Sequence, residues 1–311
     1  MYFDYYFVFN VTILLGNTMK ILIAIGGREF SKPTLDLGMK IANSFKSSTT
    51  IAYVGKKISQ FSEKDVSVVH QNLDDRELYR PGIRTLEWAY DFLISKKYIE
   101  EKDSNKFNDY LLVDEENSRM KVLLKGQQSD KIDLIMRTGE IIEQLKNEVE
   151  TNKHDITIIG GGGNKGIHQK LVQFIDSSVF VVKNYSVNKK YRILLPINES
   201  KGSDMAIETA INFAKSYKLD VEIVSVPEGK KSIEEVEKIL LKTKDKFLKN
   251  KIKASTKLIS GSAVNSIVNH AKDDSIVILG VSPKNPIMKY FFGSKPLSIA
   301  QKCNCPVLIT K

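Results

Sequence analysis

Cysteine is nearly absent from this sequence of 311 residues, which contains only Cys303 and Cys305, one residue apart. With no second cysteine pair, the chain has neither a disulfide framework nor a zinc site. We expect the two cysteines to lie in a strand and to remain unbridged. So few cysteines fit a reducing compartment, and we predict a cytoplasmic protein.

Catalytic and metal-binding clusters are also lacking. The four histidines are isolated, and none has a metal-ligand partner at helical spacing; they are His70, His154, His168 and His270. The sequence shows no arrangement of a nucleophilic side chain with a general base. It also shows no pair of carboxylates that suggests a shared site. The sequence therefore predicts no metal site and no efficient catalysis.

Negative charge is outweighed by positive charge, with 47 basic and 37 acidic residues and a net charge of +10. The lysines are spread along the chain and alternate with glutamates, as they do between Lys230 and Lys253. No motif combines basic with aromatic residues. We interpret the excess as a solvated basic surface and expect no nucleic-acid partner.

A long apolar segment is missing as well. Residues 1–18 are rich in aromatic side chains, but Asn10 interrupts them and they are too few for a membrane span. They also lack a basic stretch and a cleavage site of the signal-peptide kind. We expect Met19 to be the true start or residues 1–18 to be a poorly determined extension, and we expect no membrane partner. A membrane anchor is the alternative.

The chain contains an internal repeat of about half its length. Residues 21–25, ILIAI, align with residues 193–197, ILLPI, and the alignment continues without a gap. It pairs Ser31 with Ser203 and Val54 with Val226. Each copy reads as a buried strand, a loop, an amphipathic helix and a second strand.

The later parts of the two copies also correspond. Each has a glycine before a helix, Gly139 in the first and Gly261 in the second. Apolar runs then match at residues 156–160 and 276–280, and at residues 179–183 and 307–311. Strands that alternate with helices predict a parallel α/β sheet with right-handed crossovers. We therefore predict two tandem doubly wound domains, at residues 19–183 and 190–311.

The first copy carries an insertion at about residues 59–126. We expect a helix over residues 85–97, with Trp88 and Phe92 on one face, followed by a β-hairpin. The hairpin strands are predicted at residues 110–113 and 121–124, on either side of an acidic turn. A short linker, residues 184–190, joins the copies, which we expect to pack against each other.

In a doubly wound sheet, ligands bind beyond the carboxyl ends of the strands where the strand order reverses. In the second copy, Asn198, Val226 and the loop from Gly280 follow three predicted strands. That loop resembles the pattern of the universal stress proteins that bind ATP: Gly, two residues, Gly, nine residues, Gly and then Ser or Thr. Here Gly280 opens the pattern and Gly293-Ser294 closes it. Residues 305–309, CPVLI, are similar to that family's last strand.

The resemblance covers both copies apart from the insertion, and it implies an ATP site, with Mg²⁺, in the second copy. It places Val226 against adenine and Asn198 where the family usually has an aspartate near the adenosine. Gly293 and Ser294 would bring backbone N–H groups to the phosphates at a helix N-terminus. We also expect Pro196, Leu279, Gly280 and Lys295 at the site, the last from its position alone. Lys284 or Lys295 could add a cation.

The second copy departs from the pattern at Pro283, which stands where the second glycine belongs. Proline has no N–H, and its fixed φ excludes the left-handed conformation. The loss of one charge-assisted hydrogen bond would weaken binding by roughly 1.5–3 kcal/mol. The structural alternative is that Gly293 and Ser294 only cap a helix.

The first copy departs further. Gly26 replaces the residue aligned with Asn198, and the closing Gly-Ser is missing after the glycine run at residues 160–163. That run reads as a flexible turn, with an amide nest for an anion as the alternative. We expect the first copy to be structural.

Three functions follow from these patterns. The first is a stress-response or regulatory module that binds ATP or a related nucleotide, with slow ATP hydrolysis left open. The second is an interaction module without nucleotide. The resemblance implies that the last strands of the two copies would then pair, as a pseudo-dimer within one chain or in a homodimer. The third is an enzyme such as an adenylate-forming transferase, because a fold alone does not decide function.

Overall fold

The structure is a computed structural model, and it describes eight stretches of the chain. These are residues 18–55, 75–99, 110–115, 119–124, 131–162, 165–227, 232–281 and 295–311. All but one residue of the segment 1–18 lie outside them. So do much of the insertion and the loop at residues 282–294.

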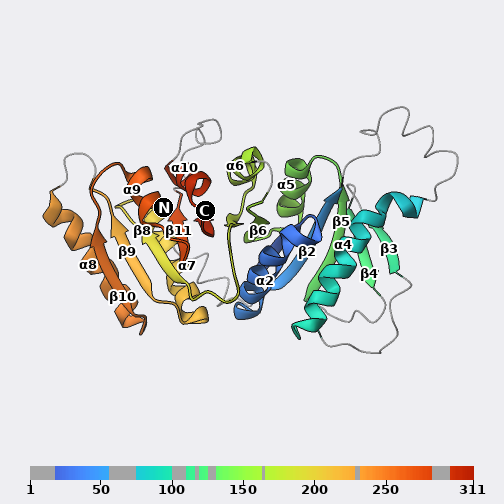
Figure 1. Cartoon of the computed structure of the whole chain (residues 1–311), viewed down its shortest axis with the longest axis horizontal. Coiled ribbons are helices and arrows are strands. Elements are labelled where there is room, and N and C mark those ends of the chain that lie inside the picture. The colour runs from blue at the N-terminus through green and yellow to red at the C-terminus, as the bar shows by residue number, and fades with distance from the viewer. Residues whose placement is uncertain are drawn as a thin grey trace, which may run out of the picture. The chain divides into compact units, whose positions relative to one another are not determined.

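The chain divides into two compact units, one ending at Thr157 and the other running from Ile158 to Lys311 (Figure 1). Strand β6 (Ile156–Gly160) crosses the division. The last helix and strand of the first sequence repeat belong to the second unit, so the units divide earlier in the chain than the repeat does.

The first unit is an α/β sheet with the strand order β1-β2-β5-β4-β3. Strands β1, β2 and β5 are parallel, and β4 and β3 continue the sheet as an antiparallel hairpin. Its elements are β1 (Lys20–Ile25), α2 (Arg28–Ser44), β2 (Ser48–Gly55), α4 (Asp75–Ser95), β3 (Tyr110–Glu115), β4 (Arg119–Leu124), β5 (Ile132–Thr138) and α5 (Ile141–Asn152).

The second unit is a doubly wound sheet with the order β10-β9-β8-β11-β12, to which β7 is added beyond β12. All of its described pairings are parallel except that of β7 with β12. Its elements are α6 (Lys165–Phe174), β7 (Ser178–Val182), β8 (Arg192–Pro196), α7 (Lys201–Tyr217), β9 (Val221–Ser225), α8 (Ile233–Lys249), β10 (Ala254–Leu258), α9 (Ala263–His270), β11 (Ser275–Gly280), α10 (Lys295–Lys302) and β12 (Val307–Thr310).

The strands read from apolar runs are buried as predicted. Ile193, Leu194 and Leu195 of β8 have no exposed surface, because helices cover both faces of a doubly wound sheet. Two helices of the second unit start at residues whose side chains cap them. Ser200 accepts a hydrogen bond from Ser203 N–H at the start of α7, and Ser232 begins a capping box at α8.

The strand registers show which elements of the two units correspond. Thr49 of β2 lies beside Ile132 of β5, and the aligned Val221 of β9 lies beside Ala254 of β10. Helix α4 packs on β2 and β5 as α8 packs on β9 and β10. The repeat therefore includes α4, and the hairpin β3–β4 is the element that the second unit lacks among its described residues.

The predicted helix of the insertion begins earlier than expected. It starts at Asp75 and passes through Pro81 and Gly82, a pair that usually ends a helix. A Cβ atom on Gly82 would lie 2.5 Å from the sulfur of Met136 and 2.8 Å from the Tyr53 ring. Glycine is needed there because α4 lies so close to the sheet.

The two closing strands, β7 and β12, are paired, as the interaction-module hypothesis expected. They run antiparallel, with Phe180 beside Leu308 and Val181 beside Val307. Each strand ends one repeat, so the pairing joins the two copies through their equivalent edges.

The cysteines do not lie in a strand, and that expectation is wrong. Cys303 and Cys305 are in the turn between α10 and β12, where both are buried. A hydrogen bond between the two thiols lowers the pKa of Cys303, and the same bond and burial raise the pKa of Cys305. The apolar run misled the prediction because the chain enters β12 only after Pro306.

Candidate functional site

The candidate site begins where β8 and β9 end. Ile197 N–H donates to the Val224 carbonyl at 2.9 Å, and Ser225 Oγ donates to the Ile197 carbonyl at 3.0 Å. These two hydrogen bonds join the ends of β8 and β9 just beyond the half-buried Pro196. Asn198 and the half-buried Val226 follow directly, so three of the predicted site residues meet at the carboxyl end of the sheet.

Asn198 organises the loop that leads into α7. Its Oδ1 accepts from Ser200 N–H at 3.2 Å, from Ser200 Oγ at 2.6 Å and from Ser203 Oγ at 2.8 Å. A backbone N–H can only donate, so the network fixes Oδ1 toward the loop and turns Nδ2 the other way. The residue is exposed, which leaves that amide group facing solvent.

The first unit builds the same loop without the side chain. Gly26 N–H donates to Ser31 Oγ at 2.8 Å, as Asn198 N–H donates to Ser203 Oγ at 2.9 Å. A Cβ atom on Gly26 would have no atom within 4 Å. The position after the first strand of each repeat therefore carries no side chain in the first unit and a polar side chain in the second.

Gly280 ends β11 against the first turn of α7. A Cβ atom there would lie 1.6 Å from the carbonyl oxygen of Gly202 and 2.2 Å from its carbonyl carbon. Only glycine permits this approach of helix to strand, whether or not a ligand binds. Gly280 thus has a packing role that the sequence did not reveal.

The other predicted residues divide into two groups. Leu279 is buried within β11, and its carbonyl accepts from Thr310 Oγ1 at 3.2 Å, so its side chain belongs to the core. Lys295 is exposed and is the first residue of α10. Gly293 and Ser294 lie outside the described residues, as do Pro283 and Lys284.

Three residues that shape this site were not singled out from the sequence. Ser200 and Ser203 bind the oxygen of Asn198, and Gly202 lies against Gly280. The Asn-x-Ser-x-x-Ser spacing after a buried strand was a usable signal, since such side chains cap helices and close turns. The contact of Gly202 with Gly280 joins residues far apart in the sequence and left no local pattern.

Comparison with known proteins concerns the residues that contain this site. The family model described as the universal stress protein family matches residues 191–311. Residues 191–311 belong to the universal stress protein family. This domain covers most of the second unit, including β8 to β12 and the candidate site.

Relatives of this universal stress protein domain include the universal stress protein YxiE of Bacillus subtilis (strain 168). It is 26% identical in an alignment of 147 residues that covers 39% of this chain and 98% of YxiE. Two solved structures share the fold of nearly the whole chain, as expected for tandem domains. A universal stress protein from Archaeoglobus fulgidus DSM 4304 is 14% identical, covers 94% of this chain and 96% of its own, and has a TM-score of 0.60.

The second solved structure is a functionally unknown protein from Pseudomonas aeruginosa PAO1. It is 12% identical, covers 96% of this chain and 94% of its own, and has a TM-score of 0.59. At such low sequence identity, the similarity to these two structures shows a shared fold alone. The α/β fold with a mostly parallel sheet, predicted from the sequence, is confirmed.

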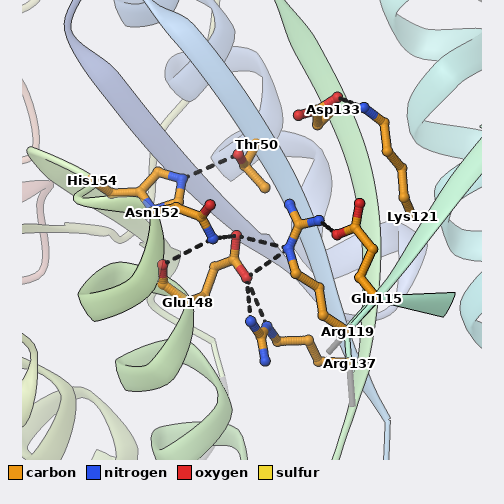
Figure 2. A network of polar contacts seen from close by, with 9 residues as sticks. All are labelled: Thr50, Glu115, Arg119, Lys121, Asp133, Arg137, Glu148, Asn152 and His154. Atoms are coloured by element: carbon orange, nitrogen blue, oxygen red, sulfur yellow. Dashed lines mark hydrogen bonds and ion pairs between the residues drawn. The ribbon is translucent and has the colours of Figure 1, made fainter. Parts of the chain in front are cut away.

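The first unit contains a second polar cluster, built around Glu148 (Figure 2). The carboxylate of Glu148 has no exposed surface and accepts from Arg119 Nε at 3.1 Å, from Arg137 Nε at 2.7 Å and from Asn152 Nδ2 at 2.9 Å. Arg119 also pairs with Glu115. These contacts tie β4, β5 and α5 together, and with both Glu148 oxygens engaged we interpret the cluster as structural.

His154 lies beside this cluster and is buried. Its Nε2 is 3.1 Å from Thr50 Oγ1, and burial lowers its pKa to about 4. The imidazole is therefore neutral near pH 7. Among the described residues, no group of three or more His, Cys, Asp or Glu side chains could hold a metal ion. No described helix is both long enough and apolar enough to cross a membrane.

Proposed function

We propose that the protein is a tandem regulatory module of the stress response that binds ATP or a related adenine nucleotide through residues 191–311. The observation that carries the proposal is the meeting of Pro196, Asn198 and Val226 at the carboxyl end of β8 and β9. This is the side of a doubly wound sheet on which ligands bind. The family match over the same residues supports it.

The described residues suggest a role for each end of the nucleotide. Val226 offers a half-buried apolar surface for the base, and the exposed Asn198 after the neighbouring strand offers the Nδ2 donor of its side chain. Lys295, exposed at the start of α10, offers a cation for the phosphates, which a helix N-terminus also favours. Gly293 and Ser294 remain part of the proposal on the strength of the sequence pattern.

Calorimetry with ATP and Mg²⁺ tests this function, with adenosine as the second ligand. Lys295→Glu should weaken ATP binding about tenfold, because it replaces a phosphate contact by a like charge. Adenosine affinity should stay unchanged. Lys257→Glu on β10 is the matched control, since it alters the net charge equally. In the strand order of the second unit, β10 is at the end opposite to β12, the strand that follows α10.

Two outcomes contradict the proposal. If the wild type binds no adenine nucleotide and releases none on denaturation, the function is wrong. If Lys295→Glu and Lys257→Glu weaken ATP equally, the proposed site is wrong.

An interaction module without nucleotide is the second candidate. The antiparallel pairing of β7 with β12 favours it, because that pairing joins equivalent edges of the two repeats as a symmetric dimer interface does. Gly26 and Pro283 favour it as well, since each removes a group that the nucleotide-binding pattern uses. Absence of binding in the calorimetry above supports this candidate over the first.

A further inference from the structure

The lysine that follows the last strand of each repeat binds the helix end of the other repeat. Lys183 follows β7, and its Nζ donates to the carbonyls of Ala300 at 2.6 Å, Gln301 at 3.0 Å and Cys303 at 3.2 Å. These carbonyls lie at the C-terminal end of α10.

The counterpart in the other repeat is Lys311, which follows β12. Its Nζ donates to the carbonyl of Ile175, the residue after α6. The two lysines occupy aligned positions, so one kind of contact occurs twice with the repeats exchanged.

Lys183 supplies a cation to the C-terminal end of α10. The last carbonyls of a helix have no partner within the helix and carry partial negative charge, which a cation there stabilises. Helix α10 has only eight residues, too few to be stable in isolation, so its order depends on packing and on such contacts. Three of its residues pack into the core: Leu297, Ile299 and Ala300.

The opposite end of α10 is Lys295, the residue proposed above to meet the phosphates. A helix of this length spans about 12 Å and moves as one body, so fixing its last turn also fixes its first. We propose that Lys183, from the first repeat, is a positioning residue for the nucleotide site of the second. The inference rests on the proposed function.

This arrangement gives the first repeat a role in binding although its own loop has glycine where Asn198 stands. Asn184 adds a further contact, since its Nδ2 donates to the Asn304 carbonyl at 2.9 Å, just after the same helix. The first repeat thus holds α10 at several carbonyls in succession.

The test compares full-length wild type with Lys183→Met, Lys183→Arg and Lys311→Met, by calorimetry with ATP and with adenosine well below the unfolding temperature. Lys183→Met should weaken ATP binding about tenfold and leave adenosine binding within twofold. Lys183→Arg keeps a cation and several donors and should recover most of the ATP affinity. Lys311→Met makes the same chemical change at the end of α6 and should leave both affinities unchanged.

Hydrogen exchange of the α10 amides, measured without nucleotide, gives an independent readout. Exchange should be faster in Lys183→Met and unchanged in Lys311→Met. If Lys183→Met does not fold, Lys183→Gln takes its place, because its amide still donates to carbonyls without the charge.

The outcomes separate the two proposals. A wild type that binds no nucleotide overturns the proposed function and this inference with it. Wild-type binding with unchanged ATP affinity in Lys183→Met overturns this inference alone. Equal losses in Lys183→Met and Lys311→Met, or equal losses of ATP and adenosine binding, also overturn it, because they indicate general destabilisation.

Discussion

Single residues at the ends of the strands show how the two repeats have diverged. Asn198 was predicted as a site residue because it follows a buried strand at the point where the strand order reverses. Its position could be predicted, since it depends on a periodic pattern. The three donors around its oxygen could not, because they depend on the conformation of the turn.

Substitution by alanine should change the free energy of unfolding very differently at two glycines. Gly280→Ala places a Cβ atom 1.6 Å from Gly202, so α7 must move, at a cost of about 3 kcal/mol. Gly26→Ala has open space and a φ that alanine accepts, so its stability should stay within about 1 kcal/mol of the wild type. Urea unfolding of both variants checks this, and a neutral Gly280→Ala would contradict the packing role.

His154 should make stability depend on pH. Burial holds its folded-state pKa at about 4, below the 6.5 of an exposed histidine. Between these values the unfolded chain binds a proton that the folded chain does not, so stability falls as the pH drops from 6.5 to 4. The loss should reach about 3 kcal/mol.

Comparison with His154→Gln, unfolded in urea at pH 7 and at pH 4.5, isolates this effect from that of the neighbouring Glu148, Lys20 and Arg119. The difference between wild type and variant should shrink or reverse as the pH falls. A constant difference would show that His154 is protonated in the folded chain or is exposed.

At the scale of elements, strands and helices followed from the sequence where periodicity was strong. The apolar runs gave the central strands, and the hairpin strands were placed to within a few residues. The start of α4 was missed because Pro81 and Gly82 read locally as a break, whereas packing against Tyr53 and Met136 selects glycine there. The turn containing Cys303 was missed because an apolar sequence alone does not distinguish a buried turn from a strand.

Glu148 is one of the residues that join the hairpin to the rest of the first unit, through its ion pair with Arg119. Glu148→Leu should destabilise the protein by about 3–5 kcal/mol, because it removes the carboxylate that is paired with Arg137, which is only 1% exposed. The double variant Arg137→Leu/Glu148→Leu removes both charges of that pair and should recover a large part of the loss. Denaturant unfolding measures both, and a double variant less stable than Glu148→Leu would contradict this account.

At the scale of the whole chain, the duplication predicts one nucleotide per molecule. The second repeat has Asn198 where the first has Gly26, whose position offers no side chain to a ligand. Calorimetry or native mass spectrometry should give a stoichiometry of one for ATP. Two equivalent sites would show that the backbone of the first repeat suffices.

The outer edges of the repeated sheets have been protected by two different means. In the first unit, β4 pairs with β5, and β5 has the apolar sequence IDLIM at residues 132–136. In the second, β10 ends the strand order, and the matching residues 254–258 read ASTKL, with Lys257 exposed. An exposed lysine discourages an edge strand from pairing with another molecule. The two copies therefore protect corresponding strands from aggregation in different ways. In the first copy β4 covers the edge of β5, and in the second the charge of Lys257 discourages pairing at the edge of β10.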